Sequence, residues 1–190
     1  FEENITWNIL YEKVCKFSNY LKKLRLKKGD RVAAYVPNKI ETVISFLACA
    51  KNGIIWSSCS PDFGVQGVVD RFKQIEPKVL ITSDYYFYNG KKINILDKVD
   101  EVLKQISSIE KVIVYSYYKN EKENLKNFID FEEALNIESD ETFERFEFNH
   151  PIYILFSSGT TGKPKCITHG TGNVLIEHNK EFMLHCDIRD

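Results

Sequence analysis

Hydrophobic residues along the chain follow two spacings. In four stretches they recur every three or four residues, the spacing of an amphipathic helix, and between these stretches lie short apolar runs of strand length. The predicted helices span residues 6–26, 38–52, 61–75 and 95–106, and the predicted strands span residues 31–36, 54–57, 79–82 and 112–115. Strands that alternate with helices predict an α/β fold with a mostly parallel sheet flanked by helices.

Capping residues mark where three of these helices should begin. Thr6 is expected to cap the first helix and Asn38 the second, since short polar side chains accept hydrogen bonds from the free N–H groups of a helix start. Ser60, Pro61 and Asp62 together predict the third start, with a capping hydroxyl, a proline at the first helical position and an acid in the first turn. The inner face of the second helix is predicted to carry Ile40, Val43, Ile44 and Leu47.

The chain becomes more polar after its fourth predicted strand. Residues 118–127 are expected to form a surface loop, and residues 132–147 hold seven acids against one arginine. This acidic stretch predicts a solvated connection around a short helix at residues 131–135. A subdomain boundary near residues 149–150 is one interpretation of where the stretch ends.

Composition limits the class of protein. Among the 190 residues, 26 Lys or Arg oppose 27 Asp or Glu, and the net charge of −1 gives no general attraction to nucleic acid or anionic membrane. The longest apolar runs, residues 54–56 and 152–156, are far too short to span a membrane. Five cysteines without a Cys-x-x-Cys pair fit reduced thiols better than the disulfides of a secreted protein. We therefore expect a cytoplasmic (cytosolic) protein whose partners are small molecules.

Residues 157–165 carry the most informative chemistry. The sequence Ser-Ser-Gly-Thr-Thr-Gly-Lys-Pro-Lys follows an apolar run that is predicted to be a buried strand. Its glycines let consecutive N–H groups approach one ligand, its hydroxyls add neutral donors and its lysines add positive charge, a combination that suits a polyphosphate. The predicted phosphate-binding residues are Ser157, Ser158, Gly159, Thr160, Thr161, Gly162, Lys163 and Lys165.

This loop differs from the common mononucleotide-binding loop. That motif needs a glycine five residues before its Gly-Lys pair and a helix after it, whereas here Ser157 holds the place of the first glycine and Pro164 follows Lys163. Because proline disfavours helical geometry in the residue before it, we expect the chain to return as an extended segment, residues 165–169. The alternative, an ordinary turn between two strands, would not require nine consecutive residues that all suit phosphate.

The same nine residues resemble the AMP-binding signature of the adenylate-forming superfamily, which comprises acyl-CoA synthetases, luciferases and the adenylation domains of peptide synthetases. Other stretches resemble the acetoacetate–CoA ligase branch (acetoacetyl-CoA synthetases) of that superfamily. These stretches are Gly53–Gly67, Asp70–Phe72, Gln74–Leu80 and Glu177–Asp187. The resemblance covers essentially the whole chain and implies a partial N-terminal domain of an adenylate-forming enzyme.

The resemblance also implies a two-step reaction. Acetoacetate and ATP would give an acyl-adenylate and pyrophosphate, and the thiol of CoA would then displace AMP to give acetoacetyl-CoA. Residues 157–165 would hold the β- and γ-phosphates of ATP, beside Mg²⁺ whose ligands lie mostly outside this chain. The residues given a CoA-binding role are Ser60, Pro61, Asp62, Lys91 and Lys92. The two lysines follow an Asn-Gly pair and so also fit an ordinary exposed turn.

Later motifs of the superfamily are absent from these 190 residues, among them the adenine-binding segment, the ribose-binding aspartate and the C-terminal domain with its catalytic lysine. Residues 1–190 are therefore interpreted as an incomplete N-terminal AMP-binding domain, which we expect to be inactive by itself. Two alternatives stay open: a CoA ligase for acetate or propionate, and a non-catalytic nucleotide-binding module.

Weaker candidates favour structural roles. His178, Glu181 and His185 share one face of a predicted C-terminal helix, but they lack the spacing of a zinc-binding helix. We interpret them as a solvated polar face and predict no metal site. Cys59 and Cys166 lie near the two predicted ligand segments, and both are expected to be small buried residues without an activated thiolate.

Overall fold

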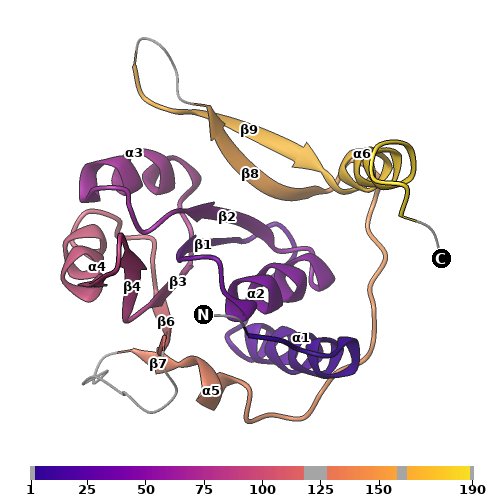
Figure 1. Ribbon diagram of the computed structural model, residues 1–190, viewed down its shortest axis with the longest axis horizontal. Coiled ribbons are helices and arrows are strands. Elements are labelled where there is room, and N and C mark those ends of the chain that lie inside the picture. Colours follow the sequence, from indigo (N-terminus) through magenta and orange to yellow (C-terminus); the bar gives the residue numbers. More distant parts are fainter. Residues whose placement is uncertain (1–2, 118–127, 158–161, 189–190) are drawn as a thin grey trace.

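The computed structural model describes residues 3–117, 128–157 and 162–188. Within this part of the chain, seven strands form one sheet in the order β7-β6-β3-β1-β2-β8-β9 (Figure 1). Neighbouring strands are parallel except for β8 and β9, which form an antiparallel hairpin. The strands span Arg31–Tyr35 (β1), Ile55–Cys59 (β2), Val79–Ser83 (β3), Lys111–Tyr115 (β6), Ile129–Asp130 (β7), Pro151–Ser157 (β8) and Lys165–Gly170 (β9). The predicted α/β class and mostly parallel sheet are confirmed.

Helices cover both faces of this sheet (Figure 1). They span Trp7–Lys23 (α1), Ile40–Lys51 (α2), Val65–Ile75 (α3), Leu96–Leu103 (α4), Phe131–Ala134 (α5) and Thr171–Leu184 (α6). Side chains of α1, α2 and α5 share a core with one face of the sheet, and those of α3 and α4 share a second core with the other face. The central strands are therefore buried on both sides, which explains the uninterrupted apolar run of β1 after Arg31.

The inner face of α2 agrees with the prediction in part: Ile44 is buried and Ile40 packs against the core. Thr6 caps α1 as predicted, but α2 begins at Ile40 without a side-chain cap, and Asn38 is not its N-cap. Val43 and Leu47, predicted to face inward, are 47% and 36% exposed.

A polar pair joins α1 to the end of α2. Ser18 Oγ of α1 donates to Asn52 Oδ1 at the end of α2 at 2.8 Å, and Asn52 Nδ2 donates to the Ser18 carbonyl oxygen at 2.8 Å. Both residues are buried, so the reciprocal hydrogen bonds satisfy them. The α2 face turned inward therefore carries polar as well as apolar residues.

The start of α3 also differs from the prediction. The helix begins at Val65 after Gly64, and residues 61–63 form turns. The hydroxyl of Tyr35, at the end of β1, donates to the carbonyl oxygens of Pro61, at 3.2 Å, and of Phe63. Because a buried side chain engages these two carbonyls, the chain does not enter the helix at Ser60.

A second, two-stranded sheet lies outside the elements that the sequence predicts. It consists of β4 (Tyr85–Tyr88) and β5 (Lys91–Asn94), which pair in antiparallel fashion between β3 and α4. Asn89 and Gly90 join them with φ angles of 48° and 74°, the positive values that a two-residue hairpin turn of the mirror-image type requires. The hairpin therefore follows directly from the carboxyl end of β3.

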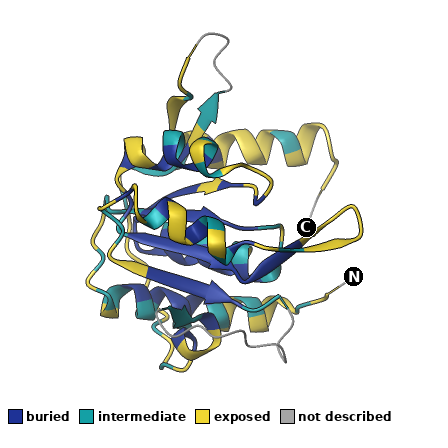
Figure 2. Ribbon diagram, turned by 90° about the vertical axis from the view of Figure 1, so that its left-hand side faces the viewer, coloured by how far each residue is buried: buried dark blue, intermediate teal, exposed yellow. Residues whose placement is uncertain are grey.

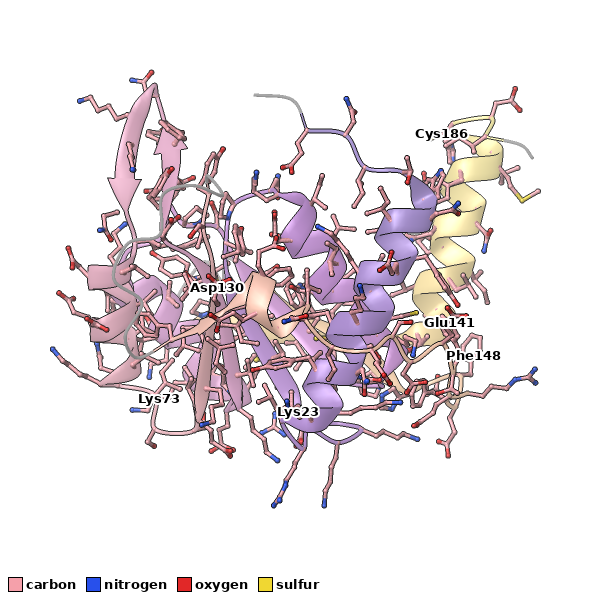
Figure 3. The ribbon with its side chains drawn as sticks, turned by 90° about the horizontal axis from the view of Figure 1, so that it is seen from below. Lys23, Lys73, Asp130, Glu141, Phe148 and Cys186 are labelled. Carbon is pink, nitrogen blue, oxygen red and sulfur yellow. The ribbon has the colours of Figure 1, made fainter. Side chains whose placement is uncertain are left out.

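Residues 136–150 carry the chain from α5 to β8 without helix or strand. Lys22 Nζ of α1 lies 2.8 Å from Asp140 Oδ2, and Lys51 Nζ of α2 donates to the Thr142 carbonyl oxygen at 2.6 Å. The connection thus follows the outside of α1 and α2, where Glu141 and Phe148 are labelled in Figure 3. The short helix predicted at 131–135 is confirmed by α5, residues 118–127 lie outside the described residues, and the boundary at 149–150 stays a prediction.

The β8–β9 hairpin and α6 are the most exposed part of the described chain (Figure 2). Ile154 is the buried residue of β8 and Val174 that of α6, so the prediction of a buried strand before residue 157 is wrong. β8 pairs with β2 at one Cα position, Trp56 with Tyr153, and β9 forms the edge of the sheet.

Cysteine burial agrees with one expectation and contradicts another. All five cysteines are free, as expected of reduced thiols, and Cys59 is buried as predicted. Cys166 is exposed, because β9 is an edge strand. Across the described helices, none has the length and apolar character needed to cross a membrane.

Candidate functional site

Both predicted ligand segments follow the carboxyl ends of neighbouring strands. β8 runs parallel to β2, so Ser157 at the end of β8 and Cys59 at the end of β2 lie toward the same edge of the sheet. From β1 and β2 the chain continues to helices on opposite faces, α2 and α3. In open α/β sheets, ligands bind outside the carboxyl ends of the strands at such a change of face. This edge is therefore the candidate site.

The predicted phosphate loop connects the two strands of the β8–β9 hairpin. Ser157 and Lys165 are register partners, and the strand that begins at Lys165 confirms the predicted extended return after Pro164. Gly162, Lys163 and Lys165 are exposed or partly exposed, and Ser157 is half-buried. The remaining predicted phosphate-binding residues, Ser158, Gly159, Thr160 and Thr161, lie outside the described residues.

Helix α3 contacts the returning limb of this loop through Gln74. Its Nε2 donates to the Pro164 carbonyl oxygen at 2.8 Å, and its Oε1 accepts from Cys166 Sγ at 3.7 Å. Beside this contact lies a cavity of about 230 Å³, whose lining includes Asp70 of α3 and Lys163 of the loop. The sequence places Gln74 on the polar side of a helix but does not identify a partner 90 residues away, so sequence patterns alone miss this residue.

The second predicted segment, Ser60, Pro61 and Asp62, lines another cavity at the same edge. This cavity has a volume of about 300 Å³ and is bounded by residues after β1, residues after β2 and β4 of the small hairpin. Its lining includes Asn38, Thr42 and Tyr86. The structure thus brings together three segments that are distant in sequence, around a space open to a ligand.

Buried contacts hold the Ser60–Asp62 segment in place. Tyr35 donates to the carbonyls of Pro61 and Phe63 as described above, and burial raises the pKa of its phenol well above the usual range, so the hydroxyl stays a donor. The guanidinium of Arg71 lies 4.3 Å from the centroid of the Phe63 ring, a cation–π contact from α3. The Ser60–Asp62 wall of the cavity is therefore held by Tyr35 of β1, and the adjoining Phe63 is held by Arg71 of α3.

The predicted CoA-binding lysines lie on β5, opposite β4. Lys91 pairs with Tyr88 and Lys92 with Phe87, and the Lys92 ammonium lies 3.8 Å from the centroid of the Tyr85 ring. Tyr88 and Phe87 themselves line the 300 Å³ cavity. The structure therefore places both lysines on the hairpin that bounds this cavity, although neither lines it.

Cys59 is not an activated thiol. Burial raises the pKa of its thiol to about 12, which the nearby charge of Arg71 only partly opposes. Since a thiolate is the reactive form of cysteine, this residue is inert at neutral pH. Its buried position at the end of β2 supports the predicted structural role.

The histidines of α6 form no metal site with their described neighbours. His185 Nε2 lies 3.9 Å from Glu181 Oε2, and Lys180 forms ion pairs with Glu177 and Glu181. Across the described ranges, no three His, Cys, Asp or Glu side chains gather closely enough to hold a metal ion. The described part of α6 has the charged, exposed surface expected of a solvated helix face.

Known proteins are similar to this chain in sequence and in fold. The family described as AMP-binding enzyme matches residues 1–188. An acetoacetyl-coenzyme A synthetase of Rhizobium meliloti (strain 1021) is 44% identical over 193 residues, covering 98% of this chain and 29% of that protein. A malonamoyl-CoA synthetase of Penicillium aethiopicum is 39% identical over 197 residues, covering 97% of this chain and 27% of that protein. A solved acetoacetyl-CoA synthetase from Streptomyces lividans matches with a TM-score of 0.92 and 38% identity, covering 98% of this chain and 28% of that one. The chain thus spans less than a third of the length of these relatives.

Proposed function

Since this chain belongs to the AMP-binding enzyme family, we propose that it supplies the phosphate-binding and CoA-binding edge of an ATP-dependent acid–CoA ligase. The observation that carries the proposal is the β8–β9 hairpin, in which Ser157, at the carboxyl end of β8, is the register partner of Lys165. Its sequence, rich in glycine, hydroxyl groups and lysine, suits the triphosphate of ATP. Such a ligase uses ATP and CoA as substrates, and the free cysteines of this chain suit a reducing compartment. The cytosol is therefore its proposed location.

In the first step, the ionised carboxylate of the acid attacks the α-phosphorus of ATP. A bond forms between a carboxylate oxygen and phosphorus, and the bond from phosphorus to the bridging oxygen breaks, so pyrophosphate leaves with the electron pair. No general base is needed because the nucleophile is already ionised. The part of this chain is to hold the β- and γ-phosphates and to neutralise the growing negative charge with Lys163 and Lys165.

The family also implies Mg²⁺ bound with ATP. The described residues near the loop offer lysines and a hydroxyl rather than a cluster of carboxylates, and lysine is not a ligand for a hard cation. The described donor set therefore does not fit the ion. We propose that the magnesium ligands come from the nucleotide and from parts of the enzyme outside residues 1–190.

In the second step, the CoA thiol loses its proton to solvent and its sulfur forms a bond to the acyl carbonyl carbon. The bond from that carbon to the phosphate oxygen breaks, and AMP leaves with the electron pair. We propose that the 300 Å³ cavity beside Ser60, Pro61 and Asp62 accepts part of CoA, and that Lys91 and Lys92 on the adjoining hairpin pair with its phosphates. Lysine ammonium groups bind phosphate as point charges.

Acetoacetate is the proposed acid. The acetoacetyl and malonamoyl groups in the names of the two relatives both carry a second carbonyl group, at the carbon two positions from the thioester carbon. We therefore propose a short acid with a carbonyl at that position, with acetoacetate preferred over acetate and propionate. The contrasting proposal is a non-catalytic nucleotide-binding module.

One experiment separates these possibilities. The full-length polypeptide encoded by the gene is assayed for CoA-thioester and AMP formation with acetoacetate, malonamate, acetate and propionate. The proposal expects kcat/KM to be highest for acetoacetate, whereas a preference for acetate or propionate contradicts the proposed acid, and ATP binding without turnover supports the non-catalytic module. The 190-residue chain assayed alone is expected to release no pyrophosphate, since it spans less than a third of the length of its relatives.

A further inference from the structure

We propose that Gln74 is a positioning residue for the returning limb of the phosphate-binding loop. The proposal rests on the function proposed above, because it concerns how the ligase holds Lys163 and Lys165 against ATP. Gln74 does not touch the reacting atoms; it acts through the backbone between the two lysines.

The Gln74 amide holds the chain on both sides of Lys165. It donates to the carbonyl oxygen of Pro164, the residue before, at 2.8 Å and accepts from the thiol of Cys166, the residue after, at 3.7 Å. A side-chain amide can do this because it carries a donor and an acceptor. Its Nε2 also donates to the Asp70 carbonyl oxygen at 2.6 Å, one turn earlier on α3, which fixes the side chain against its own helix.

The packing of β8 also places the Cys166 side of the hairpin toward α3. Phe156 of β8 is the register partner of Cys166, and Phe156 packs against the core beneath α3. Side chains alternate along a strand, so Lys165 projects to the face opposite Cys166. Lys163, in contrast, lines the cavity on the α3 side. The contact with Gln74 thus divides the two lysines between two sides of the hairpin.

The contact with Gln74 stabilises the register of β9 against β8, which the hairpin by itself stabilises only weakly. β9 is an edge strand whose residues Lys165 to Thr168 are exposed, so little side-chain burial opposes a shift in register. A shift of one residue would turn every side chain of the strand to the other face. Gln74 opposes such a shift from outside the hairpin, and it thereby fixes the face of β9 from which Lys165 projects.

The test compares Gln74→Met and Gln74→Ala with a matched control in the full-length polypeptide. Gln74 is exposed, and both replacements suit a helix, so the variants are expected to fold. The control is Gln105→Ala, since Gln105 lines the same cavity but donates to the Glu101 carbonyl oxygen, one turn earlier in the chain, at 3.3 Å. Acetoacetate-dependent exchange of pyrophosphate into ATP gives KM for ATP and kcat separately.

Loss of one positioning hydrogen bond is expected to raise KM for ATP about fivefold in both Gln74 variants, with kcat changed by less than about twofold. The KM for acetoacetate and the melting temperature are expected to match wild type, and Gln105→Ala is expected to behave as wild type throughout. An unchanged KM for ATP in Gln74→Met, or an equal rise in Gln105→Ala, overturns the inference.

A second readout distinguishes failure of the inference from failure of the proposed function. If wild type transfers nothing from ATP, the proposed function fails, and the contact is then judged by alkylation of Cys166 with iodoacetamide in the full-length polypeptide. Freed from Gln74, the thiol is expected to react more than about twofold faster in Gln74→Met, while the exposed Cys186 serves as internal reference. Equal rates for Cys166 in both proteins overturn the contact itself.

Discussion

Ser157 and Lys165 face each other as register partners at the end of the β8–β9 hairpin. Residues 158–164 therefore connect two positions that lie side by side. Lys163 and Lys165 are exposed on this loop, at the carboxyl edge of the sheet. In the proposed reaction, positive charge placed there would stabilise the leaving pyrophosphate more than the bound ATP, because the negative charge on the leaving group grows as the bond breaks.

The first prediction concerns these two lysines. Replacement of Lys163 or Lys165 by glutamine is expected to lower kcat/KM for ATP by about tenfold or more in the full-length polypeptide, since each loses a charge-assisted contact with phosphate. Lys104→Gln, at the end of α4, is the matched control and is expected to leave kcat/KM unchanged. Steady-state kinetics of pyrophosphate release measure the effect, and equal values for all three variants would contradict it.

The second prediction concerns the 300 Å³ cavity proposed for CoA, and it distinguishes this cavity from the loop, residues 157–165, proposed for ATP. Tyr35→Phe removes the hydroxyl that donates to Pro61 and Phe63, so the wall of the 300 Å³ cavity loses its support from β1. KM for CoA is expected to rise about threefold and the free energy of unfolding to fall by about 1 kcal/mol. Acetoacetate-dependent ATP–pyrophosphate exchange, which does not use CoA, is expected to stay unchanged. A loss of exchange with an unchanged KM for CoA would refute the separation.

The third prediction concerns the pH dependence of stability. Partial burial raises the pKa of the Asp30 carboxyl, but hydrogen bonds from Lys78 Nζ and from the Lys27 backbone N–H, with the charges of Lys78 and Arg31, bring it below its ordinary value of 3.8. A carboxyl whose pKa is lower in the folded state stabilises the fold at higher pH, and this stabilisation is lost as the pH falls below about 4.

Asp30→Asn is therefore expected to lower the free energy of unfolding by about 1 kcal/mol at neutral pH. The difference from wild type should shrink as the pH is lowered from about 5 to about 3, because the ordinary pKa of a carboxyl lies within this range. Urea denaturation at several pH values measures it, with Asp100→Asn on the exposed side of α4 as control. A difference that does not change over this range would show that Asp30 contributes through something other than its charge.

The fourth prediction compares two glycines with positive φ. Gly29 (φ 86°) has no atom within 4 Å of where a Cβ would lie, whereas at Gly53 (φ 64°) a Cβ would lie 2.6 Å from Phe146 Cε1. The Phe146 ring is stacked on His150, with ring centroids 5.0 Å apart, so it cannot move aside freely. Gly29→Ala is expected to cost about 1 kcal/mol through backbone strain alone, and Gly53→Ala at least about 2 kcal/mol. Equal losses in chemical denaturation would contradict the proposed crowding at Gly53.

Much of the fold follows from local sequence. The spacing of apolar residues predicts α1 and the buried strands of the sheet, because each of these elements buries a continuous set of side chains. Pro164 predicts the extended return that becomes β9, since its effect on the preceding residue is local. The loop and its position after a strand are therefore predictable from neighbouring residues alone.

The remaining features depend on partners distant in sequence. The start of α3 is set by the hydroxyl of Tyr35, and the end of α2 is joined to α1 by the pairing of Asn52 with Ser18. The β4–β5 hairpin has little hydrophobic alternation, so the Asn89–Gly90 turn is its clearest signal. No local pattern could indicate the contact of Gln74 with Pro164.

Exchange of labelled pyrophosphate into ATP, in the presence of acetoacetate and the full-length polypeptide, tests the central claim that residues 157–165 hold the triphosphate. The decisive variant replaces Gly159, Thr160 and Lys163 together by alanine, which removes a glycine, a hydroxyl and a charge. We predict that wild type catalyses the exchange and that the triple variant loses it by about a hundredfold or more. No exchange by wild type, or equal exchange by both proteins, would contradict the account.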